Sequence, residues 1–227
     1  MLTIADDVWQ LPLTPRNGIN AYLIGDVLVD TGIEQSADKI AGMLDGRSIA
    51  AIALTHAHND HAGAMKRLAD RFGVPVWCGA QDRNATETGR VVLAPAFQRP
   101  RLNALVGATA GFDGAPVART LAEGDSLTAG FTVLDTPGHS PGHVSFWRES
   151  DRTLICGDVF FNMHLFTTIP SLRQPPHLFT TDPAQNRRSE RRLAALEPGT
   201  VGFGHGPVLG DGAARKLRDF VRTLPPG

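Results

Sequence analysis

The chain has 227 residues, of which 20% are charged, and its formal net charge is −1. This balance excludes the compositions that are typical of polyanion binders and of disordered proteins. The length and the 42% of hydrophobic residues predict one domain, residues 1–227, with a sizeable core.

The first half of the chain alternates strand-like and helix-like segments. Apolar runs predict strands at residues 18–24, 27–29, 49–54 and 74–78, and helices are predicted at residues 35–44 and 62–71. An Asp-Thr-Gly turn that begins at Asp30 follows the second of these strands.

The most informative segment directly follows the run at residues 49–54. It places four metal donors within six positions: His56, His58, Asp60 and His61. Imidazole nitrogen and carboxylate oxygen suit zinc, iron or manganese, whereas an all-thiolate set would indicate a closed structural zinc. In a tight loop, His56 and His58 can face one side while Asp60 and His61 face a second centre. This geometry suggests two metals.

The second half also has predicted strands that end in donors. The strands cover residues 131–134, 144–147, 153–156 and 200–203, and a helix covers residues 183–196. Three further donors lie where such segments give way to glycine or proline: His139, Asp158 and His205. Loops on a rigid sheet are a usual place for functional side chains. His143, four residues after His139, is interpreted as a structural residue or a support for a ligand.

Two stretches, residues 84–114 and 160–181, show no regular pattern. Long irregular loops in a compact domain usually have a function. In the second stretch, Phe161, Phe166 and His164 are candidate substrate contacts, because an apolar wall above the donors would accept an acyl or aromatic group. The alternatives are packing beneath the loops and a contact between two copies in a homodimer.

The ordered donor set resembles that of the metallo-β-lactamase-fold superfamily. Seven positions match in the right order, and the similarity includes residues 18–24 and 27–32, so it extends over essentially the whole chain. The resemblance implies an α/β (α+β) fold, a four-layer αβ/βα sandwich of two mixed β-sheets with outer helices.

The family pattern implies the following ligand sets: His56, His58 and His139 for one metal, Asp60, His61 and His205 for a second, and Asp158 as a bridge. The metals would be two divalent ions, zinc first, with iron or manganese as alternatives. They would lower the pKa of a shared water toward about 7 and provide a hydroxide nucleophile. Asp60 would be catalytic, orienting this hydroxide and shuttling a proton. Asp30 is a candidate to accept a hydrogen bond from a ligand imidazole and fix its tautomer.

The implied activity is hydrolysis of a small ester, thioester or lactone, as in the glyoxalase II and lactonase branches. Asp158 stands where several zinc β-lactamases carry a cysteine ligand, so β-lactam hydrolysis, like nuclease activity, ranks below this prediction. Typical glyoxalase II adds a helical domain with basic residues for glutathione, whereas only residues 206–227 follow His205. The alternative within this fold is a mononuclear iron enzyme that resembles persulfide dioxygenases.

The expected partner is a small-molecule substrate. An arginine cluster at residues 187–192 is interpreted as a solvated helix face, so no nucleic acid is expected. No apolar run approaches 18 residues, which predicts no membrane span. The acidic first residues contain no basic residue before Arg16, so we expect a cytoplasmic protein without a secretory signal.

Overall fold

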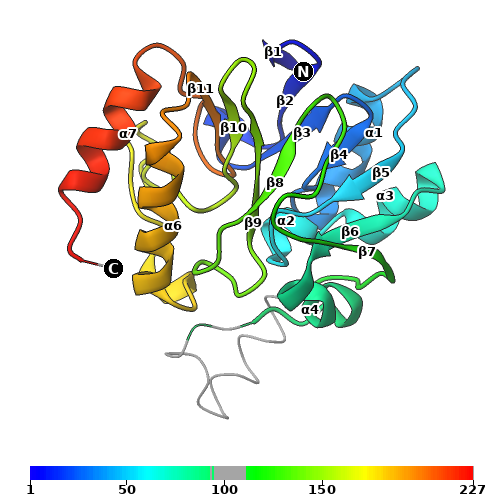
Figure 1. Ribbon diagram of the computed structural model, residues 1–227. Helices are drawn as coiled ribbons and strands as arrows, with labels where there is room; N and C mark the ends of the chain where they lie inside the picture. Colours follow the sequence, from blue (N-terminus) through cyan, green and yellow to red (C-terminus); the bar gives the residue numbers. More distant parts are fainter. Residues whose placement is uncertain (93, 95–110, 227) are drawn as a thin grey trace.

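The computed structural model describes residues 1–92, 94 and 111–226, which form two β-sheets with helices outside them (Figure 1). The first sheet contains, in spatial order, β1 (Leu2–Ala5), β2 (Val8–Pro12), β3 (Asn20–Ile24), β4 (Val27–Val29), β5 (Ala51–Ala53), β6 (Val76–Gly79) and β7 (Val117–Leu121). The second sheet has the order β11 (Thr200–Gly202), β10 (Thr153–Ile155), β9 (Val144–Arg148) and β8 (Thr132–Asp135). The main helices are α1 (Ala37–Met43), α2 (Asn59–Ala62), α3 (Met65–Phe72), α4 (Arg83–Thr88), α6 (Pro183–Ala195) and α7 (Ala213–Arg222).

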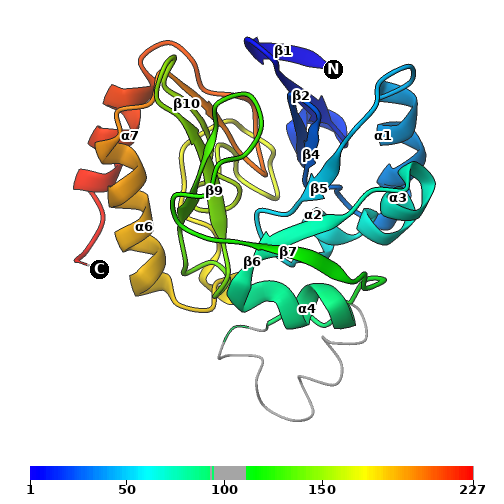
Figure 2. The same cartoon turned by 45° about the vertical axis from the view of Figure 1, so that its right-hand side comes forward.

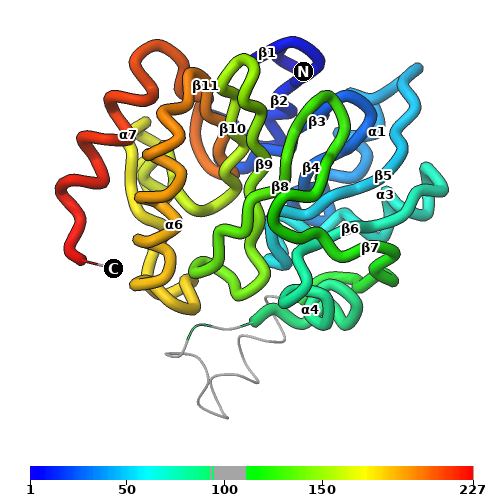
Figure 3. Tube along the Cα trace, viewed as in Figure 1, coloured from blue at the N-terminus to red at the C-terminus, as the bar shows by residue number. Residues whose placement is uncertain are grey.

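Three apolar clusters separate four layers. The first cluster joins Leu23 of β3 to Ile40 of α1, and the second joins Tyr22 of β3 to Phe146 of β9 across the two sheets. The third packs the far face of the second sheet, including Leu154, against α6 and α7. Figure 2 shows α1 and α3 on one outer side and α6 and α7 on the other, and the trace in Figure 3 follows the chain between them. The predicted four-layer sandwich is confirmed.

The four layers explain why the central strands of the first sheet are rich in apolar residues. Successive side chains of a strand alternate between its two faces. In β3, Leu23 faces the helical side, whereas Tyr22 and Ile24 face the second sheet. Because both faces are covered, β4 and β5 are apolar along their length, and so is β3 after Asn20, rather than alternating with polar residues.

Parallel pairing brings several strand ends to one edge of each sheet. Strands β4, β5 and β6 run parallel, as do β10 and β11, whereas β8, β9 and β10 pair antiparallel. The predicted donors lie in the segments that follow β5, β10 and β11 and in the connection between β8 and β9. The carboxyl edge of parallel strands is the place where ligands usually bind in such sheets.

The structure corrects several predicted elements. The helix predicted at residues 62–71 is divided, because α2 ends at Ala62 and α3 begins at Met65. A side chain on Gly63 would lie 2.4 Å from the carbonyl oxygen of Asn59 and 2.8 Å from the backbone nitrogen of Glu34, so the chain turns tightly here. The stretch 84–114 was predicted to be irregular, but its first residues belong to helix α4. Residues 89–92, 94 and 111–114 of this stretch are also described and include Val91 and Val92, whereas residues 93 and 95–110 lie outside the described part.

The predicted elements did not include strands β1, β2 and β7 or helix α7. β7 carries an exposed and two half-buried residues in its centre, so it lacks the continuous apolar run of β5. None of the helices in the described ranges combines the length and the apolar character needed to cross a membrane.

Candidate metal centre

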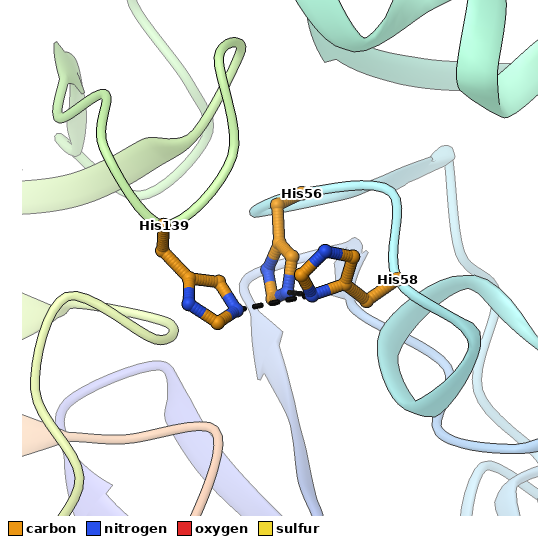
Figure 4. A group of neighbouring side chains, drawn as sticks. All are labelled: His56, His58 and His139. Atoms are coloured by element: carbon orange, nitrogen blue, oxygen red, sulfur yellow. Dashed lines mark hydrogen bonds between the residues drawn. The ribbon is translucent and has the colours of Figure 1, made fainter. Parts of the chain in front are cut away.

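The first group of donors comes from two loops that belong to different sheets. His56 and His58 follow β5, and His139 lies between β8 and β9. The Nδ1 atom of His58 lies 3.0 Å from Nε2 of His56 and 3.0 Å from Nε2 of His139 (Figure 4). Ligand nitrogens of a tetrahedral zinc, each about 2.0–2.1 Å from the ion, lie roughly 3.3 Å apart, so this spacing suits a shared cation.

The second group combines a short helix with the loop after β11. α2 carries Asp60 and His61, and Nε2 of His205 lies 3.3 Å from Oδ2 of Asp60. One ligand atom from each of the three residues lies within 4.8 Å of the others. His56 and His58 thus lie with His139, and Asp60 and His61 lie with His205, whereas a third possible group combines His56, His61 and Asp158.

Asp158 lies between the two groups. Its Oδ2 atom lies 3.4 Å from Nε2 of His139 and 3.3 Å from Nε2 of His205, and its Oδ1 atom lies 3.4 Å from Nε2 of His61. The side chain is 3% exposed. The structure therefore brings the other six predicted donors together around the buried carboxylate of Asp158.

Outer hydrogen bonds orient the imidazoles so that unprotonated nitrogens face the centre. The Nδ1–H of His61 donates to Asp30 Oδ2 over 2.8 Å, and the Nδ1–H of His205 donates to the carbonyl of Gly18 over 2.6 Å. The hydroxyl of Thr55 donates to Asp30, so it accepts from the Nδ1–H of His56. In its neutral form each of these rings presents the lone pair of Nε2 inward, which is the form that binds a metal.

A cation fits this centre because two buried polar atoms lack a hydrogen-bond partner. They are Nε2 of His61 and Oδ1 of Asp158, and both face the gap between the groups. Buried polar atoms without partners are rare and require an explanation. An imidazole nitrogen beside a carboxylate oxygen is a donor set for a divalent cation. These two atoms are therefore suitably placed to bind one.

Charges within the centre divide the histidines into two classes. Burial lowers the pKa of His56 and His139, and the neighbouring histidines lower it further. Burial also acts against the charged form of His205, but Asp158 and Asp60 outweigh it and raise the pKa of His205 to about 10. Asp158 and Asp30 likewise raise the pKa of His61 against the effect of burial. Without metal, these effects disfavour the charged form of His56 and His139 and favour the charged form of His61 and His205.

This difference predicts that the second group binds metal more weakly as the pH falls. A divalent ion must displace protons from His61 and His205, whereas His56 and His139 have none to lose at neutral pH. We expect the affinity of the second group to rise about 10- to 100-fold per pH unit near pH 7, for one or two protons released. Competition with a chromophoric chelator at several pH values, corrected for the chelator's own protonation, measures this. If the metal affinities of the two groups depended equally on pH, the prediction would be wrong.

Sequence reasoning missed Asp82, which joins the two histidine loops. It is fully buried and ends a 3₁₀ helix, Ala80–Asp82, that follows β6. Its carboxylate accepts hydrogen bonds from Ala57 N–H, Ser140 Oγ–H and Gly142 N–H at 3.1, 2.6 and 2.8 Å. Asp82 thus holds the His56 loop and the His139 loop at a set separation. In the sequence, the only feature that could have indicated a role for Asp82 is its position shortly after a strand, which it shares with Asp30 and Asp158.

His143 supports Asp158 rather than joining the donors. The backbone N–H of Asp158 donates to Nε2 of His143 over 3.1 Å, so the proton is on Nδ1, which contacts Thr136 Oγ1 at 2.9 Å. Burial lowers the pKa of His143 to about 3, which keeps this ring neutral. The ring positions the start of the Asp158 loop.

Gly204 approaches the donors so closely that no side chain fits. A methyl group there would lie 2.1 Å from Oδ1 of Asp158 and 2.5 Å from Cε1 of His61. We expect Gly204→Ala to weaken metal binding by about 10- to 100-fold, because the donors must shift by a large part of an ångström. Metal content after dialysis measures the effect. Gly42→Ala is the matched control, since a methyl group at Gly42 meets no atom within 4 Å; equal metal content in both variants would contradict the prediction.

A cavity of about 290 Å³ opens over the donors. Phe161 lines it, 3% exposed, with its ring centroid 4.4 Å from that of His205. The other two predicted pocket residues do not line it: Phe166 is 93% exposed, and His164 contacts Phe166 instead. Leu165 takes the place expected of them, because in an irregular loop the sequence does not reveal which side chains turn inward.

Residues 14–205 match the family model described as the metallo-beta-lactamase superfamily. The chain belongs to this superfamily. "Probable metallo-hydrolase YflN" of Bacillus subtilis is 29% identical over 95% of this chain and 85% of its own length. A hydroxyacylglutathione hydrolase of Bdellovibrio bacteriovorus is 34% identical, but over 51% of this chain and 36% of its own length. Metal binding and hydrolysis are thus supported for this metallo-β-lactamase-superfamily protein.

Solved structures agree with this membership. The crystal structure of TTHA1623 in a di-iron-bound form is 31% identical in sequence, with a TM-score of 0.71, and the match covers 93% of this chain and 99% of that chain. The metallo-β-lactamase fold was thus predicted correctly from the donor pattern. The metal in TTHA1623 is iron, so the fold does not by itself select zinc.

Proposed function

We propose that this metallo-β-lactamase-superfamily protein is a dinuclear metal-dependent hydrolase that cleaves a small ester, thioester or lactone. The position of Asp158 carries the proposal, because its carboxylate lies 3.3–3.9 Å from imidazoles of both groups. A buried carboxylate between two groups of donors suits a bridge between two cations. Two divalent ions, zinc first with iron or manganese as alternatives, would supply an activated water and polarise the substrate carbonyl.

Asp60 is the residue to which we assign the catalytic proton transfer. Its side chain is 39% exposed and lines the cavity, whereas that of Asp158 is 3% exposed. Burial raises its pKa, but His205 and His61 outweigh this effect and hold the pKa of Asp60 well below its usual range. Asp60 is therefore ionised, so its Oδ2 can accept a hydrogen bond from an attacking water and orient it, and we propose that it relays the water's proton transiently to the leaving group.

The experiment that tests the proposal combines elemental analysis with a substrate panel. Protein purified without chelators should contain about two divalent ions per chain. It should cleave members of a panel of aryl esters, thioesters and lactones, and a chelator should abolish turnover. Two ions per chain without cleavage of any of these bonds would contradict the proposal.

A second candidate function uses a single iron; TTHA1623 binds iron in this fold, although it binds two ions. In this alternative, one iron held by the first group and Asp158 would support a reaction like that of persulfide dioxygenases. One iron per chain together with oxygen uptake on addition of a glutathione persulfide would establish this candidate in place of the hydrolase.

A further inference from the structure

The lining of the cavity over the donors has two chemically different parts. One part consists of side chains of the metal centre, including Asp60, His139 and His205. The remaining lining is apolar apart from Asn59 and consists of Ile33, Val91, Val92, Ala94, Phe161, Leu165, Leu178 and Phe179. From this division we infer that the substrate carries a neutral, apolar acyl group, which lies on the apolar lining while its reactive carbonyl faces the donors. This inference rests on the proposed hydrolase function and specifies its substrate class.

The charges around the cavity distinguish a neutral group from an anionic one. No lysine or arginine lines the cavity within the described ranges. Bound cations would concentrate positive charge at the donors, so a carboxylate at the other end of a substrate would lie among alkyl and aryl groups, with no cationic partner among the described lining residues. Burying an unpaired charge in such surroundings is costly, and the cavity therefore selects against substrates with a second carboxylate.

Phe161 gives the apolar wall a fixed position. Its backbone forms a pair of hydrogen bonds with Arg173, at 3.0 and 2.9 Å, that holds the strand-like part of this loop. The Phe161 ring lies 4.4 Å from the His205 ring and 6.4 Å from the His139 ring, measured between centroids, so it borders both donor groups. An acyl chain can start at the donors and continue along this ring without crossing a polar surface.

The mouth of the cavity continues the apolar lining outward. Leu178 and Phe179, in a 3₁₀ helix at His177–Phe179, are 49% and 52% exposed although they are large and apolar. Exposed apolar patches usually mark a place where a ligand or partner binds. The volume of about 290 Å³ lies at the lower end of the range for ligand pockets. Together these features suit a short to medium acyl chain whose end reaches Leu178.

The inference is tested with two matched ligand series of increasing chain length, one ending in a methyl group and one in a carboxylate. Phenyl esters report turnover. Alkyl hydroxamates, which chelate metal whether or not the protein is a hydrolase, report binding by calorimetry. Within the methyl series we expect kcat/KM and the association constant to rise about three- to four-fold per methylene until the cavity is full. The carboxylate series should show no such rise.

A charge placed at the mouth should reverse this preference. Leu178→Lys puts an ammonium group beside the far end of the chain, so it should improve carboxylate-ended ligands at least about 10-fold relative to methyl-ended ligands. Ile169→Lys is the matched control, because Ile169 is an exposed apolar residue of the same loop, 63% exposed, that does not line this cavity. It should leave both series unchanged.

The outcomes separate the inference from the proposed function. A chain-length dependence of hydroxamate binding without cleavage of any ester would support the apolar site and contradict the hydrolase. Ester cleavage that is indifferent to chain length, or that prefers the carboxylate series, would support the hydrolase and overturn the inference. Equal effects of the two lysine variants would also overturn it.

Discussion

Replacing Asp158 with alanine is expected to remove metal from both groups and to abolish hydrolysis. The Asp158 carboxylate lies between His139 and His205 and is the only acid in the described ranges that lies within 4 Å of imidazoles from both groups. Loss of residues that merely support metal ligands lowers affinity about 10- to 100-fold. Removal of a bridging ligand should lower the metal affinity more than removal of a supporting residue. We therefore expect at least a 100-fold lower affinity at each site. Elemental analysis after dialysis and turnover of a cleaved ester provide the measurements.

Two further variants make this result specific. Asp158→Asn keeps the shape of the side chain and removes its charge, so it should also lose metal. Asp70→Ala removes an exposed acid that pairs with Lys66 on helix α3, and it should retain full metal content because exposed ion pairs contribute little. Circular dichroism should show folded protein in all three. An Asp158→Ala protein with two ions per chain and full turnover would refute the bridging role.

Replacing Asp82 with alanine is expected to have the second largest effect, on stability and on metal binding together. Three buried donors, Ala57 N–H, Ser140 Oγ–H and Gly142 N–H, would lose their acceptor. Each unsatisfied donor costs about 1–3 kcal/mol, so we expect the free energy of unfolding to fall by roughly 3–5 kcal/mol, with water satisfying part of the loss. The metal affinity of the first group should also fall, because the distance between the loops that carry His58 and His139 is no longer fixed by Asp82. Urea denaturation of metal-free protein measures the first effect.

Matched variants distinguish a positioning role from general destabilisation. Ser140→Ala removes one donor and leaves the carboxylate in place, so it should cost about 1 kcal/mol and leave metal affinity near that of the original protein. Asp82→Asn keeps one acceptor oxygen and should recover part of both properties. If Asp82→Ala loses stability while its first group binds metal with unchanged affinity, Asp82 does not position the histidines.

Much of the centre could be predicted because its residues lie close together in the sequence. The loop from His56 to His61 follows a strand that is buried on both faces, and an apolar run followed by four donors is visible without a structure. The local chain geometry also contributes to the grouping of the donors, since Asp60 and His61 lie on α2, whereas His58 precedes this helix. Asp30, in a left-handed turn after β4, accepts the hydrogen bond from an imidazole that the sequence suggested.

The tertiary structure decided everything that depends on distance between loops. Asp82 and His143 act on residues of other loops, and no local pattern marks an acid or imidazole for such a contact. The same holds for the cavity, where Leu165 and not Phe166 faces inward. By itself the sequence determined the donor types, their order and the family. The packing of two sheets, driven by apolar clusters on both faces of each, decided how loops about 80 to 150 residues apart meet, because burial specifies contacts that local spacing does not contain.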